Sequence, residues 1–350
     1  MHTDQRLARA TEAVTALRRL TQLGKFLPFV IASRSMLELI GAIELTRDSR
    51  APVLITGETG TGKELLALTT HALSSRRSRE FIAFNCASSS RELIESQLFG
   101  HQSGSFTGAS DDFKGVIREA DGSTLLLDEI GELSLDLQPK LLRFLQEGEA
   151  HPVGASKPVK TDVRVIAATN RNLEADVSAG RFRADLFERF NVARLHIPPL
   201  RERREEIPML IEHFMDRYQR EERKQGLRLS DEALEMLSGH EWPRNARQLG
   251  NEVRRLVTLS LDDEVIGADR LSPEIRNAAN SSSASAAMIV EGRIVIDANL
   301  PYHEMKYEME RLYIAHGLRQ VGGNLQQAAA RMKMSRFGLS KAMVRLGIKA

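Results

Sequence analysis

The stretch Val53-Leu-Ile-Thr-Gly-Glu-Thr-Gly-Thr-Gly-Lys63 decides the fold, because an apolar run there breaks into a glycine-rich loop that ends in lysine. Gly57, Gly62 and Lys63 fit the phosphate-loop pattern G-x-x-x-x-G-K. Glycines let the backbone curl so that its N–H groups point at phosphate oxygens, and the lysine adds a positive charge for the β- and γ-phosphates. The residues expected to surround the phosphates are Gly57, Glu58, Thr59, Gly60, Thr61, Gly62, Lys63 and Glu64.

The flanking segments favour a phosphate-binding loop over the alternative, a plain glycine-rich turn. The run after Pro52 is typical of a buried strand. Glu64-Leu-Leu-Ala-Leu-Thr-Thr-His71 is typical of a helix, whose N-terminal dipole favours an anion. Glu64 stands where many phosphate loops carry the Ser or Thr hydroxyl that binds Mg²⁺. A metal bound with the nucleotide must therefore use another carboxylate.

A second motif, Thr124-Leu-Leu-Leu-Asp128-Glu129, supplies that carboxylate. Successive leucines suit a parallel strand covered on both faces, and the carboxyl end of such a strand is where doubly wound sheets bind ligands. Asp128 is suited to hold Mg²⁺, and Glu129 to orient and deprotonate the water that attacks the γ-phosphate. The alternative is an ordinary boundary between a strand and a turn. The upstream phosphate loop favours the nucleotide interpretation.

Two further strands carry polar residues to the same edge. Residues 81–86 form a short predicted strand with Asn85 near its end, and residues 163–170 form a buried one that ends in Thr169 and Asn170. Polar groups there can contact the γ-phosphate or order the attacking water. Arg183 and Arg189, near a predicted helix, are either solvated charges or arginine fingers that reach across a subunit boundary.

Composition limits what the whole chain can be. A length of 350 residues predicts two or three domains, and 42% hydrophobic with 27% charged residues describes a soluble globular protein. A net charge of +2 means that any basic surface must be local. The single cysteine, Cys86, excludes an internal disulfide framework. No apolar run approaches the ~20 residues that span a bilayer, so we expect a cytoplasmic protein.

Helical segments follow the nucleotide motifs. Residues 205–219, 230–238 and 245–259 are predicted helices of a small lid, from which Arg247 could reach the nucleotide, and 277–287 is a flexible linker by composition. Two short helices near the C-terminus, joined by a tight turn, follow a longer one. From residue 317 onward there are seven Lys or Arg and no Asp or Glu. These charges suit DNA phosphates, although a helical bundle with a solvated basic face is the alternative.

Two segments are more ambiguous. Residues 1–25 are predicted to form an amphipathic helix that packs on its own domain or a neighbour. The loop Gly104-Ser-Phe-Thr-Gly-Ala109 sets one aromatic residue between glycines. From the residues alone we favour a surface turn with Phe106 folded back onto the body, over a mobile loop that presents Phe106 and Thr107 to a partner.

Together these motifs resemble the bacterial enhancer-binding proteins, the AAA+ activators of sigma-54 RNA polymerase. The resemblance runs from about Phe29 to Leu271 and resumes from Tyr302 to Ile348. Residues 57–64 resemble the Walker A motif of this family, which also has Glu after Lys, and 125–129 resemble its Walker B motif. The resemblance implies roles for polar residues around the nucleotide: Asn85 couples Glu129 to the nucleotide, Thr169 and Asn170 are sensor I, Arg183 and Arg189 act in trans, and Arg247 is sensor II.

The resemblance also reverses the interpretation of the glycine-flanked loop. That loop is similar to the family's G-A-F-T-G-A motif, with Ser105 in place of Ala. The implied sigma-54 contact comprises Gly104, Ser105, Phe106, Thr107, Gly108 and Ala109. Other departures are Arg244 and Gln248, in Trp242-Pro-Arg-Asn-Ala-Arg247-Gln, where the family usually has W-P-G-N-V-R-E.

The C-terminal helices resemble the Fis-type DNA-binding domain of these activators. The implied DNA contacts are Ser335, Arg336, Ser340, Lys341 and Arg345. Gly338 and Ala342 stand at usually bulkier positions, so the sequence of the DNA site cannot be transferred. No receiver or sensor domain precedes the AAA+ motifs, and the chain therefore resembles the subgroup controlled in trans by a regulatory protein.

The expected fold is an α/β AAA+ P-loop NTPase, with a parallel sheet flanked by helices, a helical lid subdomain and a C-terminal all-α helix-turn-helix domain. The expected divisions are an N-terminal extension (1–28), the α/β subdomain (29–200), the lid (201–272), a linker (273–300) and the DNA-binding domain (301–350). The resemblance implies ATP and Mg²⁺ as cofactors. It implies sigma-54 holoenzyme and upstream double-stranded DNA as partners, and a ring, hexameric by resemblance, that could include a related second subunit. The rival interpretations are a generic AAA+ remodelling ATPase and a DNA-binding repressor with a vestigial ATPase.

Overall fold

The structure is a computed structural model that describes residues 31–87, 90–106, 110–277, 287–290, 293–296, 302–321, 324–346 and 348. The helix predicted at residues 1–25 lies outside this range, as do Thr107, Gly108 and Ala109 and most of the predicted 277–287 linker. The described chain divides into two compact units. One extends to Arg228 and resumes at Glu241–Ile266, and the other comprises Leu229–His240 and the residues from Gly267 onward.

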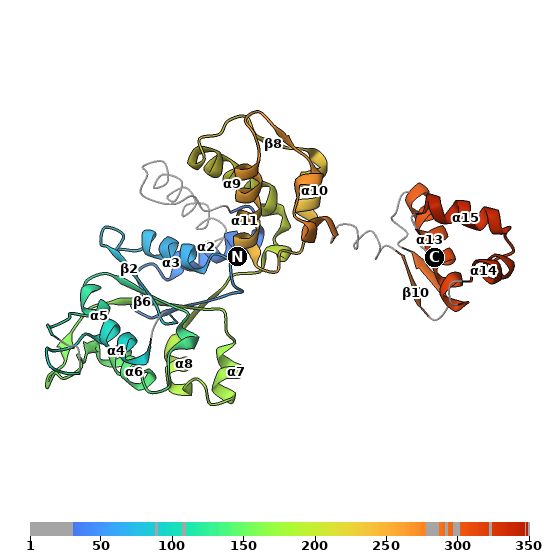
Figure 1. Cartoon of the computed structure of the whole chain (residues 1–350). Helices are drawn as coiled ribbons and strands as arrows, with labels where there is room; N and C mark the ends of the chain where they lie inside the picture. The colour runs from blue at the N-terminus through green and yellow to red at the C-terminus, as the bar shows by residue number, and fades with distance from the viewer. Residues whose placement is uncertain are drawn as a thin grey trace, which may run out of the picture. The chain divides into compact units, whose positions relative to one another are not determined.

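A five-stranded parallel sheet forms the centre of the first unit, with the strand order β2-β3-β6-β1-β7 (Figure 1). Its strands are β1 (Val53–Thr56), β2 (Phe81–Asn85), β3 (Thr124–Asp128), β6 (Arg164–Thr169) and β7 (Ala193–His196). Because the strands are parallel, their carboxyl ends share one edge of the sheet. The phosphate loop, Asp128 and Thr169 therefore lie along that edge, which confirms the predicted α/β fold.

The last strand begins earlier than predicted. We expected a strand from Leu195 to Pro199, whereas β7 pairs Ala193 with Val53 and ends at His196. The Ile197 N–H still donates to the Thr56 carbonyl at 2.8 Å. The two prolines that follow have no N–H to continue the ladder, so the strand ends before them.

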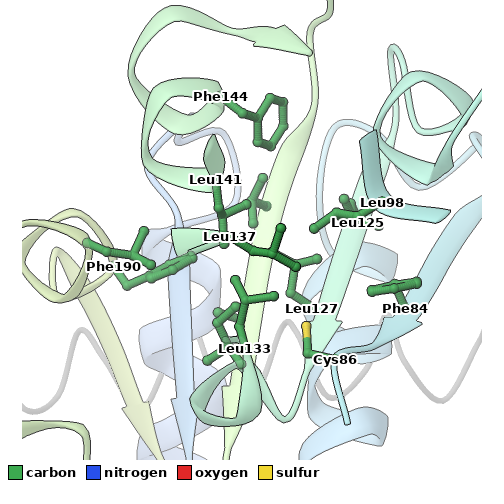
Figure 2. Packing of buried hydrophobic residues seen from close by; sticks show 14 of the residues in the cluster. Phe84, Cys86, Leu98, Leu125, Leu127, Leu133, Leu137, Leu141, Phe144 and Phe190 are labelled. Atoms are coloured by element: carbon green, nitrogen blue, oxygen red, sulfur yellow. The ribbon is translucent and has the colours of Figure 1, made fainter. Parts of the chain in front are cut away.

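Helices cover both faces of the sheet. On one face, α2 (Arg34–Leu45) and α3 (Lys63–Ala72) pack against strand residues that include Leu126. On the other, α4 (Arg91–Phe99), α5 (Val116–Glu119), α6 (Gln138–Glu147) and α8 (Ala184–Phe190) enclose Leu125 and Leu127. Figure 2 shows Leu141, Phe144 and Phe190 around these two leucines. The leucines of β3 thus alternate between two buried faces, as expected of a central parallel strand.

Shorter elements and two long helices complete the first unit. They are η1 (Ile130–Glu132), β4 (Glu149–Ala150), β5 (Val159–Lys160), α7 (Leu173–Ser178), η2 (Leu200–Glu202), η3 (Arg204–Glu206), α9 (Ile207–Glu221), α11 (Asn245–Leu259) and β9 (Val265–Ile266). The short strand β8 (Arg228–Leu229) includes the last residue before the boundary between the two units and the first residue after it. The helices α9 and α11 agree with those predicted at 205–219 and 245–259, and they pack together with Gly250 close to the Phe214 ring.

The second unit contains α10 (Asp231–Gly239), η4 (Ala268–Arg270) and the C-terminal elements. Ser230 caps α10 as predicted, because its hydroxyl accepts the Ala233 N–H at 3.2 Å. The predicted C-terminal helices are present as α13 (Tyr302–Gln320), α14 (Leu325–Arg331) and α15 (Arg336–Arg345). Their common core contains Ile314, Leu318, Ala328, Ala329, Leu339, Met343 and Leu346.

An antiparallel hairpin corrects the expectation that 273–300 is wholly a linker. Its strands are β10 (Ala287–Val290) and β11 (Arg293–Ile296), and both lie against α13. Two β-branched runs on either side of a Glu-Gly dipeptide signal such a hairpin in the sequence, but the serine- and alanine-rich stretch before them dominated the interpretation. In the described part of the chain, no helix is long and apolar enough to cross a membrane.

A buried ion pair connects the start of α2 to the phosphate loop through hydrogen bonds. Arg203 and Glu206 are almost fully buried, and their side chains pair at 2.9 Å. The second guanidinium nitrogen of Arg203 donates to the Thr61 carbonyl at 2.9 Å. The Glu206 carboxylate also accepts from the backbone N–H groups of Ala32 and Ser33 and from the Ser33 hydroxyl. The position of the loop is thus fixed partly by charges that no motif identified.

Glu206→Gln is expected to lower the free energy of unfolding by about 3 kcal/mol, because it leaves the buried Arg203 charge without a counter-charge. Urea denaturation followed by fluorescence of Trp242, the sole tryptophan of the chain, measures this change. Glu205→Gln is the matched control at an exposed neighbouring position and should stay within about 0.5 kcal/mol of the parent. Equal unfolding midpoints for the two variants would contradict the role assigned to the ion pair.

Candidate nucleotide-binding site

The phosphate loop turns on two glycines with left-handed backbone. Gly60 has φ +81°, and Gly62, with φ +102°, immediately precedes α3. A side chain at Gly60 would also collide with the Arg244 carbonyl, which lies 2.2 Å from the position that a Cβ would occupy. The loop is braced internally by the Thr61 hydroxyl, which donates to the Glu58 carbonyl at 2.8 Å. This is the glycine-dependent cradle that the sequence predicts.

Lys63 is buried inside that cradle. Its ammonium donates to the Gly57 carbonyl at 3.1 Å and lies 3.8 Å from a carboxylate oxygen of Glu129. Burial lowers the pKa of Lys63, the positive charge of Arg247 lowers it further, and the attraction of Glu129 and Asp128 opposes the change. Two positive charges, those of Lys63 and Arg247, thus act at the phosphate loop. Such charges favour the binding of an anion such as a triphosphate.

Glu129 follows β3 in a backbone conformation that is uncommon for residues other than glycine, with φ 51° and ψ 47°. Its carboxylate accepts the Asn170 N–H at 3.3 Å, and the Asn170 side chain in turn donates to the Thr59 hydroxyl at 2.9 Å. Predicted residues from the phosphate loop, the Walker B motif and sensor I therefore meet. Strained backbone of this kind concentrates at functional sites, where it directs a side chain.

Asp128 and Asn85 lie opposite each other at the ends of β3 and β2. Among the described hydrogen bonds, the side-chain oxygen of Asn85 accepts the Ala87 N–H at 2.8 Å. Its coupling to Glu129 stays a prediction. The Thr169 side chain is fully buried, and its hydroxyl accepts the Arg171 N–H at 3.1 Å.

The donor set fits Mg²⁺ that arrives with a nucleotide. Carboxylate oxygens suit this cation, and Asp128 and Glu129 supply them next to Lys63. Within the described ranges, no three His, Cys, Asp or Glu side chains form a cluster that could hold a metal. Phosphate oxygens and water would therefore complete the coordination, as is usual for Mg²⁺ at phosphoryl-transfer sites. Glu64 is exposed at the start of α3.

The start of α11 lies directly on the phosphate loop. The Arg247 N–H donates to the Gly60 carbonyl at 3.3 Å, and its Cβ lies 2.9 Å from the position of a Cβ on Gly60. The predicted sensor residue is thus brought to the site. The departures from the family pattern at this point are accommodated, because the Arg244 N–H donates to the Gln248 side-chain oxygen at 3.1 Å. Glutamine here provides the same kind of acceptor as glutamate.

Sequence reasoning assigned no role at the phosphate loop to Asn245 or Arg201, and it placed Glu58 around the phosphates without identifying these two partners. Asn245 is fully buried, with φ 55°, and its amide donates to the Glu58 carboxylate and to the Thr59 carbonyl, both at 3.1 Å. Arg201 binds both oxygens of Glu58, at 2.9 and 2.6 Å. An asparagine before the sensor arginine, together with an acidic second position in the phosphate loop, was the available signal.

The ionised form of Glu58 is strongly favoured. Its hydrogen bonds to Arg201, and to a lesser degree to Asn245, lower the pKa of this carboxyl to about 2 from an ordinary value of 4.5. A lowered pKa in the folded state stabilises the fold above the ordinary pKa, and that contribution is lost as the pH falls through about 2. The contact between Glu58 and Arg201 is therefore complete at neutral pH.

Arg183 and Arg189 are not brought to the phosphate loop of their own chain by any described contact. Arg183 precedes α8 and binds the Asp185 carboxylate, and Arg189 donates to the Leu145 carbonyl at 2.7 Å. Both side chains are exposed. Their proposed action on a neighbouring subunit stays a prediction.

His101, which precedes the glycine-flanked loop, is held by backbone and side-chain hydrogen bonds. His101 pairs with Phe113 in an antiparallel bridge and with Val153 in a parallel one, and its ring accepts or donates a hydrogen bond at 2.7 Å to the Ser96 hydroxyl. Phe106 contacts the edge of the His101 ring with its centroid at 5.0 Å, yet remains 43% exposed. The surface turn and the partner-binding loop were the two interpretations of this segment. The structure partly agrees with each, because the Phe106 ring contacts His101 and is still accessible to a partner. Gly104 and Ser105 precede it, and the contact with sigma-54 stays a prediction.

The residues predicted to contact DNA lie on or beside α15. Ser335 caps this helix, since its hydroxyl accepts the Gly338 N–H at 3.0 Å. Arg345 pairs with Glu310 of α13. All of the predicted set is exposed: Ser335, Arg336, Ser340, Lys341 and Arg345.

Comparisons with known proteins identify the families that two parts of the chain match. Residues 29–196 match the Sigma-54 interaction domain family, and residues 201–288 match the AAA+ ATPase lid domain family. The chain is 40% identical to the DNA-binding transcriptional regulator NtrC of Rhizobium meliloti (strain 1021) over 344 residues, which cover 92% of this chain and 70% of that protein. It is 47% identical to the Nif-specific regulatory protein of Herbaspirillum seropedicae over 231 residues, which cover 66% of this chain and 43% of that protein.

A solved structure supports the same assignment of the fold. The crystal structure of NtrX from Brucella abortus in complex with ATP matches with a TM-score of 0.68 and 32% sequence identity, over 96% of this chain and 73% of that chain. The chain therefore spans most of the NtrC and NtrX relatives but less than half of the nitrogen-fixation regulator.

Proposed function

This chain belongs to the sigma-54 interaction domain family of AAA+ ATPases, and from that premise we propose that it activates transcription by sigma-54 RNA polymerase, with ATP hydrolysis as the source of work. The observation that carries the proposal is the arrangement of a hydrolytic site around the phosphate loop. Lys63 and Arg247 present positive charge to the phosphates, and Glu129 lies beside them with its carboxylate held by Asn170.

The residues divide the work as the chemistry of phosphoryl transfer requires. The loop and Lys63 hold the β- and γ-phosphates, and Glu129 takes a proton from the attacking water. Mg²⁺ bound at Asp128 would neutralise the charge that develops on the phosphates. Arg183 and Arg189 of a neighbouring subunit complete the site, which implies a closed ring, hexameric by family resemblance.

The partners follow from two exposed features. The exposed Phe106 ring belongs to the loop that engages sigma-54, so hydrolysis moves that loop against the closed promoter complex. The basic, exposed face of α15 binds upstream double-stranded DNA, where Lys and Arg neutralise backbone phosphates. A regulatory protein that acts in trans would supply the physiological signal.

Open-complex formation with purified sigma-54 holoenzyme and a supercoiled promoter tests the proposal. We expect promoter melting with ATP and none with a non-hydrolysable ATP analogue, because binding alone cannot drive repeated movement of the loop. Equal melting with the two nucleotides would contradict the proposal. ATP hydrolysis without any stimulation of sigma-54 transcription would instead indicate a generic AAA+ remodelling ATPase.

A further inference from the structure

The Asn245 side chain joins three separate segments of the first unit. Its carbonyl oxygen accepts the Leu200 N–H at 2.7 Å, and its amide nitrogen donates to Glu58 and Thr59 of the phosphate loop. The residue is fully buried and so is its hydrogen bond to Leu200, whereas the two to the phosphate loop are partly buried. A buried amide whose donors and acceptor are all used fixes the relative positions of its partners closely.

The Glu58 carboxylate, which accepts a hydrogen bond from the Asn245 amide, also binds Arg201. Arg201 forms a two-pronged ion pair with Glu58, and both Arg201 and Leu200 belong to the η2 turn. Asn245 and Arg201 therefore hold the loop and the turn together at one point. Two-pronged arginine–carboxylate pairs add directional specificity that a single hydrogen bond lacks.

Asn245 lies two residues before the predicted sensor, Arg247. Asn245 is the first residue of α11, and the Arg247 N–H donates to the Gly60 carbonyl. The left-handed backbone of Asn245 sets the direction in which α11 leaves the loop. Any shift of Asn245 would therefore move Arg247 relative to the phosphates.

We propose that Asn245 is a positioning residue for ATP: together with Glu58 and Arg201, it locks the start of α11 onto the phosphate loop so that Arg247 reaches the bound nucleotide. This inference rests on the proposed ATPase function and deepens it. Arg247 remains the group that meets the phosphates, and Asn245 acts only through it.

Asn245→Gly in the full chain tests the proposal, because glycine accepts the left-handed backbone and removes only the amide. We expect the KM for ATP to rise about tenfold, with kcat at saturating ATP within about threefold of the parent, since the lost contacts position a binding group. Arg247→Ala should raise KM in the parent but add less than about twofold in the Asn245→Gly background, because the arginine is already displaced.

Asn172→Gly is the matched control, because Asn172 caps α7 through the Ala175 N–H and makes no described contact with the phosphate loop. It should lower Tm slightly and leave KM unchanged. If Asn245→Gly behaves in the same way, with an altered Tm or kcat and an unchanged KM, the positioning role is overturned.

A paired exchange provides a second test should the glycine variant fold poorly. Asn245→Asp places a carboxylate against Glu58 and should raise KM more than Asn245→Gly does. Adding Glu58→Gln removes the repulsion between the two carboxylates but also removes the charge that pairs with Arg201, so it should lower KM part of the way toward that of Asn245→Gly. No improvement in the double variant would overturn the proposal. The affinity of each variant for a fluorescent ATP analogue is measured as well. An unchanged ATP affinity in Asn245→Gly would contradict the positioning role of Asn245. Failure of the parent protein to open promoters would instead contradict the proposed function.

Discussion

Replacing Glu129 by glutamine is expected to lower ATP turnover by about a thousandfold while ATP binding stays within about twofold of the parent. Glutamine keeps the shape of the side chain and can still accept the Asn170 N–H, but its amide cannot take a proton from the attacking water. The phosphate loop and Lys63, which hold the phosphates, are left in place. Phosphate release at saturating ATP and binding of a fluorescent ATP analogue measure the two quantities separately.

Glu132→Gln is the matched control for this experiment. Glu132 lies in the η1 turn directly after Glu129, and its carboxylate pairs with Arg171 at 3.2 Å rather than with the phosphate loop. Its loss should change turnover by less than about twofold. If Glu129→Gln hydrolyses ATP at the parental rate, the assignment of the general base is wrong.

Replacing Phe106 by alanine is expected to reduce open-complex formation by at least about a hundredfold, which corresponds to about 2.7 kcal/mol at a contact of the hot-spot kind. The ring is exposed and its described ring contact is with His101, which lies outside the five-stranded sheet, so its loss should disturb neither the sheet nor the phosphate loop. ATP turnover should therefore stay within about twofold. Thr107→Ala, at a position outside the described residues, is expected to give the same separation of the two activities.

Leu45→Ala serves as the control for Phe106→Ala, because Leu45 is a similarly exposed apolar side chain, 50% against 43%, at the end of α2. It should support open-complex formation at the parental level. A parallel loss of ATP turnover and promoter opening in Phe106→Ala would place the loop in the catalytic machinery instead of at the sigma-54 contact.

The sequence predicted most of the nucleotide site because its residues come in short local motifs. Residues 57–64 and 124–129 each combine an apolar strand with the polar group that follows it, and such strands place their ends at one edge of a parallel sheet. The lid helices and the C-terminal helices were also predicted, since their apolar spacing is a local property. The β10–β11 hairpin was missed because the serine- and alanine-rich stretch before it is typical of a linker, although two short β-branched runs follow that stretch.

The P-loop AAA+ fold, the pair of carboxylates after β3 and the resemblance to sigma-54 activators could all be predicted, because each depends on residues close together along the chain. The contacts that hold the site together became visible only in the folded protein. Arg203 with Glu206, and Asn245 with Glu58 and Arg201, join segments more than 140 residues apart. No spacing rule links Thr61 to Arg203 or Glu58 to Asn245, and these contacts form only when folding brings their segments together. Water is excluded from the Arg203–Glu206 pair, whereas the Glu58–Arg201 pair stays partly exposed.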